Sequence, residues 1–273
     1  MARQRLGQHF LADAGWREEI AREIRVSPQS ITQIPTGEGA EFCWIEIGAG
    51  HGEMTEHLAY TGVPVHAVEL DPVLAAALQR LAKRFPNLEI VSADILESDI
   101  AKIAGGKRVR VYGNLPYYIT SPILHHLFAS AEIIDEINIV IQHEVALRLA
   151  AKPGSRDYGY LSVLTQYFAR PELVMEIPRG AFRPPPDVDS ALVTLRLPGE
   201  RRKLSEIDET AFLEFVKLCF SQKRKTLVNN LKSQVRADLI RDALADLNLR
   251  VDARAEQLSV SNLAGIFSQL HSG

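Results

Sequence analysis

The sequence predicts an α/β protein, in which a mostly parallel sheet is covered by helices on both faces and is followed by a small all-helical domain. Three observations support this prediction. Up to about residue 200, short runs rich in Val and Ile alternate with amphipathic segments. The strand-like runs are largely continuous in Val and Ile, as expected of strands that are buried on both faces. After Asp208 only the periodicity of helices remains.

The alternation of strand and helix can be followed along the chain. The first helix is expected over residues 12–25, where Ile20 and Ile24 lie one turn apart. The apolar run at 42–48 ends in glycines, as a buried parallel strand does before a tight turn. Further strands are expected at 63–69, 88–94, 108–114 and 136–142, and further helices at 53–61, 72–84, 121–130 and 159–169. Residues 173–178 and 191–197 are expected to form a closing antiparallel pair.

A domain boundary is expected near residue 200, where the strand-like runs end. Helices are expected near 209–221, 224–232, 236–247 and 259–270. Residues 1–200 carry 19 basic and 25 acidic side chains, whereas 201–273 carry 12 basic and nine acidic ones. Within 215–237 there are six basic residues and no acid. Such a run is either a solvated helical face or a surface that contacts nucleic-acid phosphates.

Composition excludes several classes of protein. The chain has 273 residues, of which 46% are hydrophobic and 24% charged, as in an ordinary globular protein. No apolar run approaches the ~20 residues of a transmembrane helix, and the basic N-terminus lacks the apolar core of a secretory signal. Cys43 and Cys219 are the only cysteines, which excludes a disulfide framework and favours a cytoplasmic location. The histidines have no metal-ligand spacing, so no metal is expected.

Three successive strand ends carry residues that suit an adenosine ligand. Gly48 and Gly50 follow the first expected strand and allow a ligand to approach the backbone closely. Glu69 ends the next strand and can accept hydrogen bonds from ribose hydroxyls, while Asp94 ends the third and can accept one from an adenine amine. Either acid alone is more often a helix cap. Glu53 stands where a nicotinamide fingerprint requires glycine, which argues against a dehydrogenase.

The tetrapeptide Asn114-Leu115-Pro116-Tyr117 directly follows the fourth strand and indicates the reaction. An exocyclic adenine amine is a poor nucleophile because its lone pair is delocalised into the ring. An Asn side-chain oxygen and the Pro116 carbonyl could accept the amine hydrogens and turn the lone pair toward a methyl donor. The aromatic ring could stack on the flipped base. The alternative is a plain turn, since Asn and Pro are common turn residues.

At this point the chain resembles the ribosomal RNA adenine N6-dimethyltransferase family, and most of all its small-subunit branch. The resemblance extends almost from end to end. It rests on LGQHFL (6–11), EIGAGHG (46–52), NLPYYI (114–119), QHEVALRL (142–149), YGYLSV (158–163), FRPPPDVDS (182–190), QKRKTLVNNL (222–231) and RAEQLS (254–259). It implies a Rossmann-like class I fold that binds S-adenosylmethionine (SAM), with residues 1–200 as the catalytic domain and 201–273 as a helical RNA-binding domain.

The resemblance also implies a role for individual residues in cofactor binding. The residues implied to hold SAM are Gln8, His9, Leu11, Gly48, Gly50, Glu69, Asp94, Ile95 and Asn114. Among these, Gln8, His9 and Leu11 would line the methionine end, and Ile95 would cover the adenine face.

Catalytic and RNA-binding roles are carried over in the same way. Asn114, Pro116 and Tyr117 would act on the target adenine, with Phe182 as a second aromatic wall. The alternative for Phe182 is a core residue that anchors the proline-rich loop. Lys223, Arg224 and Lys225 would bind RNA.

Three positions depart from the family pattern. His9 stands where Asn is frequent, His143 where a basic residue is usual, and Val228 where another Arg is frequent. The expected reaction is dimethylation of two adjacent adenines near the 3′ end of small-subunit rRNA, on RNA or an assembled subunit, by a monomer. Two alternatives stay open: a large-subunit methyltransferase of the antibiotic-resistance type, and a mainly non-catalytic ribosome-assembly factor.

Overall fold

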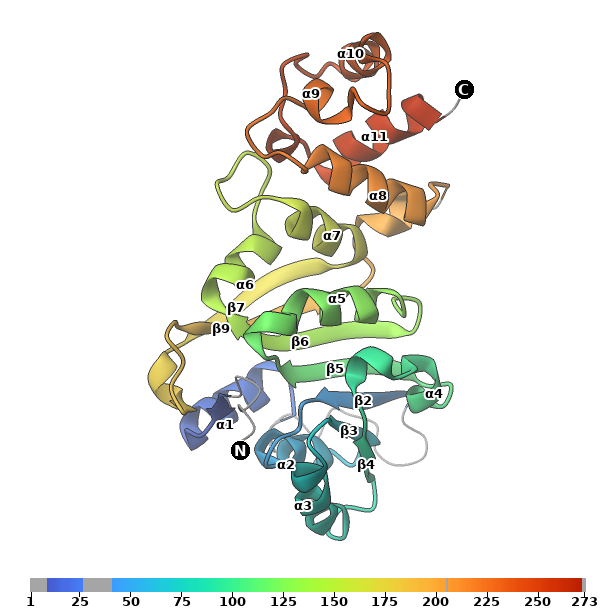
Figure 1. The fold of residues 1–273 in the computed structure, drawn as a ribbon. Coiled ribbons are helices and arrows are strands. Elements are labelled where there is room, and N and C mark those ends of the chain that lie inside the picture. Colours follow the sequence, from blue (N-terminus) through green and yellow to red (C-terminus); the bar gives the residue numbers. More distant parts are fainter. Residues whose placement is uncertain (1–8, 27–40, 205, 272–273) are drawn as a thin grey trace, which may run out of the picture. The chain divides into compact units, whose positions relative to one another are not determined.

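A computed structural model describes residues 9–26, 41–204 and 206–271 of the chain (Figure 1). Contacts divide the chain into two compact units. The first combines the residues up to Ala146 with Glu172–Leu197, and the second combines Leu147–Pro171 with Pro198–Gly273. The division at Pro198 lies close to the boundary expected at residue 200, but the second unit also takes in 147–171, which the sequence analysis assigned to the first domain.

The seven-stranded sheet has the order β4-β3-β2-β5-β6-β9-β7 (Figure 1). The strands of the first five positions are parallel, and β9 runs antiparallel to β6. Their bounds are β2 Phe42–Ile47, β3 Val65–Glu69, β4 Leu88–Ser92, β5 Arg108–Asn114, β6 Ile134–Gln142, β7 Arg170–Ile177 and β9 Ser190–Arg196. A separate two-stranded sheet pairs β1 (Phe10–Leu11) with β8 (Phe182–Arg183). The sequence analysis did not predict this second sheet.

Local sequence explains where the helices of the first unit begin. The Asp13 carboxylate caps α1 (Ala14–Glu23), and the Asp71 carboxylate caps α3 (Pro72–Ala82), whose first residue is proline. The other helices here are α2 (Glu53–Ala59), α4 (Ile100–Ala104) and α5 (Thr120–Phe128). The sequence analysis missed α4, and it also missed α6 (His143–Ala150), which contains the division after Ala146.

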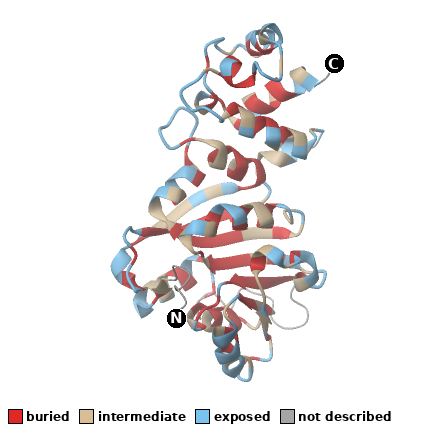
Figure 2. Cartoon of the chain, viewed as in Figure 1, coloured by how far each residue is buried: buried red, intermediate tan, exposed pale blue. Residues whose placement is uncertain are grey.

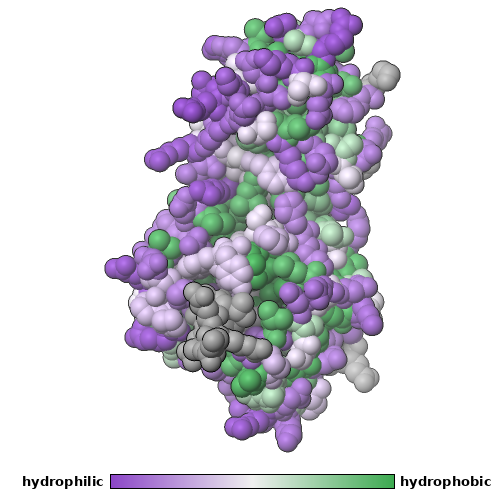
Figure 3. Space-filling model, in the orientation of Figure 1, coloured by the Kyte–Doolittle hydropathy of each residue, from purple (hydrophilic) through white to green (hydrophobic). Residues whose placement is uncertain are grey.

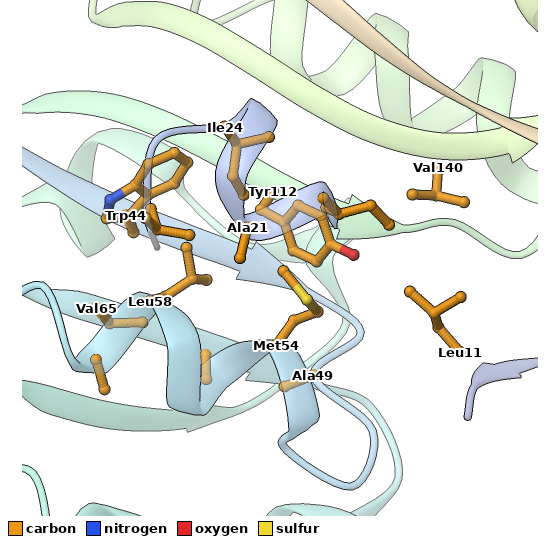
Figure 4. Packing of buried hydrophobic residues seen from close by; sticks show 14 of the residues in the cluster. Leu11, Ala21, Ile24, Trp44, Ala49, Met54, Leu58, Val65, Tyr112 and Val140 are labelled. Atoms are coloured by element: carbon orange, nitrogen blue, oxygen red, sulfur yellow. The ribbon is translucent and has the colours of Figure 1, made fainter. Parts of the chain in front are cut away.

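The core of the first unit lies against β2, β3 and β5. All six residues of β2 are buried, as expected for a strand covered on both faces (Figure 2). On one face, side chains of α1 and α2 such as Ala21 and Leu58 pack with Trp44 and Tyr112 of the sheet (Figure 4). This packing fixes the carboxyl ends of the strands, where the candidate site lies.

The second unit is helical. It contains α7 (Tyr160–Phe168), α8 (Glu209–Cys219), α9 (Leu227–Leu231), α10 (Ala237–Asp246) and α11 (Val260–His271). Tyr167 of α7 contacts Phe212 of α8, which contacts Phe267 of α11. In addition, the Tyr158 hydroxyl donates to the Leu258 carbonyl at 2.9 Å. These long-range contacts join residues 147–171 to the C-terminal helices, and a composition change near residue 200 could not reveal them.

Over the ranges that the structure describes, no helix combines the length and the hydropathy needed to cross a membrane.

Candidate active site

The candidate site lies at the carboxyl edge of the parallel strands. The glycine loop follows β2, Glu69 ends β3, Asp94 follows β4 and Asn114 ends β5. Because β4, β3, β2 and β5 are neighbours in that order, their carboxyl ends meet at one edge. Open α/β sheets bind their ligands at this edge. The sequence analysis predicted this convergence.

Glu69 organises the glycine loop. Its side chain is buried, with Oε2 accepting from the Gly50 N–H at 2.8 Å and Oε1 accepting from the Asp71 N–H at 2.9 Å. Gly50 has φ of +58°, and a Cβ there would stand 3.0 Å from the Phe10 ring. Glycine is therefore required at position 50 by both backbone conformation and space.

Asn114 is held in one orientation by the N-terminal segment. Its Nδ2 donates to the backbone carbonyl of His9 at 2.8 Å. A carbonyl can only accept a hydrogen bond, so the amide nitrogen must face His9 and the amide oxygen must face elsewhere. The N-terminal segment is itself fixed, since β1 pairs with β8. The side chain thus keeps an acceptor for another group.

Tyr117 and His9 form a pair beside Asn114. Their rings stack with centroids 5.6 Å apart and planes 27° apart. The Tyr117 hydroxyl shares a hydrogen bond of 2.8 Å with Ser190 Oγ, and His9 Nδ1 lies 2.8 Å from the Pro184 carbonyl, to which it donates. Burial raises the pKa of Tyr117, and the Ser190 hydrogen bond opposes that shift. The tyrosine ring is therefore positioned from two sides.

Two adjoining hollows open at this edge of the first unit. The first, here the Tyr117 hollow, is lined by residues that include His9, Glu69, Pro116 and Tyr117. The second, here the Glu46 hollow, is lined by residues that include Leu11, Arg17, Glu46, Glu53 and Tyr112. Both are also lined by Phe10, Gly48, Gly50 and Asn114. Asn114 is therefore placed where a group in one hollow meets a group in the other.

Glu46 is a site residue that the sequence analysis did not select. It is 2% exposed, and its Oε2 has no hydrogen-bond partner among the described residues. Burial raises the pKa of this carboxyl to about 8, and the nearby Glu53 and Glu69 add to the shift. A buried carboxyl oxygen without a partner is costly, which makes Glu46 a candidate to face a cationic or donor group of a ligand. The signal was present in the sequence as one acid within the apolar run FCWIEI.

Two expected catalytic roles have a competing explanation in the structure. Phe182 is 1% exposed and belongs to the hydrophobic core, which favours the alternative of a core residue that anchors the proline-rich loop. The Pro116 carbonyl accepts from the Ile119 N–H at 3.2 Å and from the Thr120 hydroxyl at 3.5 Å, whereas the Leu115 carbonyl has no donor among the described residues. The structure therefore favours Leu115, rather than Pro116, as the second backbone acceptor beside Asn114.

The remaining cofactor candidates differ in how the structure places them. Asp94 Oδ1 accepts from the Leu96 N–H at 2.9 Å, which is the capping role, and the adjacent Ile95 is buried. Leu11 is buried and lines the Glu46 hollow. Gln8 lies outside the described residues.

The candidate RNA-binding residues lie in the second unit. Lys223, Arg224 and Lys225 are exposed in the turns between α8 and α9, and Lys223 Nζ donates to the Arg156 carbonyl at 2.7 Å. Hydrophilic side chains predominate over the visible surface of these C-terminal helices (Figure 3).

Val228 of α9 is only 8% exposed, so its departure from the family pattern affects packing rather than a surface contact. His143, in the first unit, lies 3.2 Å from the Glu176 carboxylate.

Comparison with known proteins identifies the family. The model of the family described as ribosomal RNA adenine dimethylase matches residues 1–271. The chain belongs to this family. A protein of Koribacter versatilis named ribosomal RNA small subunit methyltransferase A is 38% identical, over 98% of this chain and 94% of its own length. A protein of the same name from Caldanaerobacter subterraneus is 34% identical, over 99% of this chain and 97% of its own length.

Solved structures confirm the fold. A dimethyladenosine transferase from Plasmodium falciparum superimposes with a TM-score of 0.76 at 22% identity, covering 94% of this chain and 96% of that one. The 23S rRNA methyltransferase ErmE superimposes with a TM-score of 0.69 at 25% identity, covering 96% of this chain and 99% of that one. The Rossmann-like methyltransferase fold with a helical C-terminal part is thus confirmed. The family and the relatives also confirm the enzyme class, which is an rRNA adenine dimethyltransferase.

Within the described ranges, no group of three or more His, Cys, Asp and Glu side chains is arranged to hold a metal ion.

Proposed function

We propose that this enzyme transfers methyl groups from SAM to N6 of two adjacent adenines in a hairpin near the 3′ end of small-subunit rRNA. The observation that carries the proposal is the fixed amide of Asn114 at the junction of the two hollows. Its oxygen is available to accept a hydrogen bond, which is what a reacting adenine amine requires. The names of the full-length relatives support the small subunit as the substrate.

The residues at the site fit SAM. Glu69, together with Asp94 and Ile95, would hold the adenosine, and the backbone at Gly48 and Gly50 leaves room for a ligand. The unpartnered oxygen of Glu46 fits the ammonium of the methionine end, and the acids of this hollow suit a ligand that also carries a sulfonium charge. When bound, SAM supplies an electrophilic methyl group.

The target adenine would occupy the part of the Tyr117 hollow lined by Pro116 and Tyr117, while Glu69 on the same lining would face the cofactor. Tyr117 would stack on the flipped base, which RNA presents most easily from a single-stranded or terminal position. Asn114 Oδ1 and the Leu115 carbonyl would accept the two amine hydrogens, which directs the nitrogen lone pair out of the ring plane. The rate then comes mainly from positioning and from exclusion of water. The methylated amine loses its proton to water, so no strong base is needed.

RNA would be held by the exposed cations of the second unit, Lys223, Arg224 and Lys225. Such cations contact phosphates without reading sequence, so they position the RNA rather than select the adenine. The substrate is small-subunit rRNA or an assembled small subunit, and the protein acts as a monomer. Both cysteines are free and buried, which suits a reducing cytoplasm.

The deciding experiment is labelled-methyl transfer from SAM to unmodified small subunits, to large-subunit RNA and to no added RNA, with mass spectrometry of the nucleosides. N6,N6-dimethyladenosine confined to the small subunit is the expected result. Label in large-subunit RNA would assign the protein to the resistance type. SAM binding without transfer to any RNA would leave only an assembly role.

A further inference from the structure

The Glu46 hollow contains a cation as well as acids. Arg17 of α1 lines it together with Glu46 and Glu53. We propose that the Arg17 guanidinium binds the α-carboxylate of the methionine end of SAM, and so makes this end of the site selective for a zwitterion. This inference rests on the proposed use of SAM and adds a residue that determines which sulfonium ligands the protein accepts.

The hydrogen bonds of Arg17 leave part of its guanidinium available. Its Nη1 donates to the Leu11 carbonyl at 2.9 Å and to the Ala12 carbonyl at 2.8 Å. Among the described residues, neither Nε nor Nη2 has a hydrogen-bond partner. A guanidinium offers five donors in one plane, and it binds carboxylates with two of them at once. One nitrogen thus fixes the side chain while the others can serve a ligand.

Charge balance in the hollow requires such a cation. Glu53, together with Glu46 once the ligand's ammonium has displaced its proton, favours the ammonium and the sulfonium of SAM, but both carboxylates repel its α-carboxylate. A carboxylate that enters this hollow beside two acids needs a positive partner at close range. Arg17 lies in the same lining and supplies it, on the side formed by the N-terminal segment. The arrangement matches the opposite charges of an amino acid's two ends.

A purely structural role is the competing explanation. Through Nη1, Arg17 joins α1 to the end of β1, so its loss could loosen the N-terminal segment. Loosening would weaken every ligand of the site equally. A carboxylate contact would weaken only ligands that carry the carboxylate, and this difference separates the two roles.

The first test uses the wild-type protein and calorimetric or fluorescence binding of SAM and decarboxylated SAM, which lacks only the α-carboxylate. SAM is expected to bind at least about tenfold more tightly, the size of one charge-assisted contact. Equal affinities would overturn the role of Arg17. No SAM binding at all would instead overturn the proposed function.

The second test uses Arg17→Gln, which removes the charge but keeps an amide that can donate to the Leu11 or Ala12 carbonyl. It should lower SAM affinity about tenfold or more and leave decarboxylated SAM nearly unchanged. Arg17→Lys, which keeps the charge, should recover part of the loss. Arg22→Gln, on the same helix and paired with Glu19, is the matched control and should change neither affinity. Equal losses for both ligands would show that Arg17 only supports the N-terminal segment.

Discussion

The carboxyl edge of the first unit and the basic turn of the second differ in how their side chains are held. At the edge, the Asn114 side chain is fixed by the His9 carbonyl, 105 residues away in sequence. In the turn, Lys223, Arg224 and Lys225 are exposed, and among the described residues only the Lys223 side chain donates a hydrogen bond. The first region can therefore position reacting atoms, while the second can supply charge that adapts to an RNA backbone. Single substitutions in the first region should lower methyl transfer strongly, whereas substitutions in the second should each weaken RNA binding a little and add together.

Asn114→Ala should have the largest effect. Methyl transfer is expected to fall at least about 10²-fold, because positioning and acceptor groups at a reacting centre contribute on this scale. SAM affinity should fall much less, since the cofactor keeps its other contacts. Single-turnover transfer and calorimetry measure the two effects. Equal losses in both would contradict the role of Asn114 toward the target amine.

Tyr117→Ala should have the next largest effect. Loss of a base-stacking ring costs about 1–3 kcal/mol, which should appear in kcat/KM for RNA. Tyr117→Phe keeps the ring and loses the hydrogen bond with Ser190, so most of the activity should remain. Steady-state kinetics of the two variants test this. If Tyr117→Phe lowered kcat/KM as much as Tyr117→Ala, the hydroxyl rather than the ring would be the group that contributes to activity.

Replacing Lys223, Arg224 and Lys225 together by Ala should weaken RNA binding without changing transfer at saturating RNA. The slope of log affinity against log salt should become shallower, by about 0.7 for each phosphate contact to single-stranded RNA that is lost. Titrations at several salt concentrations measure the slope. Arg236→Ala and Arg250→Ala remove cations that are already paired with Asp238 and Asp252, and they serve as controls. An unchanged slope in the triple variant would place the RNA surface elsewhere.

Glu46→Gln should have the smallest effect, and it should depend on pH. The folded-state pKa of Glu46 is raised from 4.5 to about 8, so the folded protein retains a proton that the unfolded chain releases between these values. The stabilising contribution of this group is therefore complete below pH 4.5 and is lost as the pH rises through about 8. When thermal unfolding is measured at several pH values, the stability of Glu46→Gln should not show this decline.

The same variant tests the contact with SAM. If the ligand's ammonium pairs with Glu46, binding at pH 7 should release up to about one proton from the wild type and none from Glu46→Gln. Calorimetry in two buffers of different ionisation enthalpy measures the released protons. Equal release from both proteins would assign the protons to another group.

Much of the fold was predictable because its signals are local. Continuous Val/Ile runs identified β2, β3, β5 and β6, and the glycines and acids at strand ends indicated where a ligand would bind. Asn114 and Tyr117 were predictable for the same reason, since the tetrapeptide that follows β5 is contiguous. In each case the chemistry depends on residues close together in sequence.

Other features depended on contacts between distant segments. The pairing of β1 with β8 joins Leu11 to Phe182, and two-residue strands have no periodicity that a sequence could reveal. That pairing accompanies the burial of Phe182, which the family resemblance had placed beside the target base. Arg17 and Glu46 were also missed, because nothing in the sequence shows that a helix arginine and a strand acid line one hollow.

The sequence by itself determined the parallel sheet, the helical C-terminal part, the family and the positions of the main strand-end residues. Their signals are periodicity and contiguous motifs, which the chain carries before it folds. Only the tertiary structure decided the orientation of the Asn114 amide, the Leu115 carbonyl that no described donor contacts, and the charge pattern of the Glu46 hollow. Each of these depends on which distant backbone or side chain lies within hydrogen-bonding distance, and packing alone sets that distance.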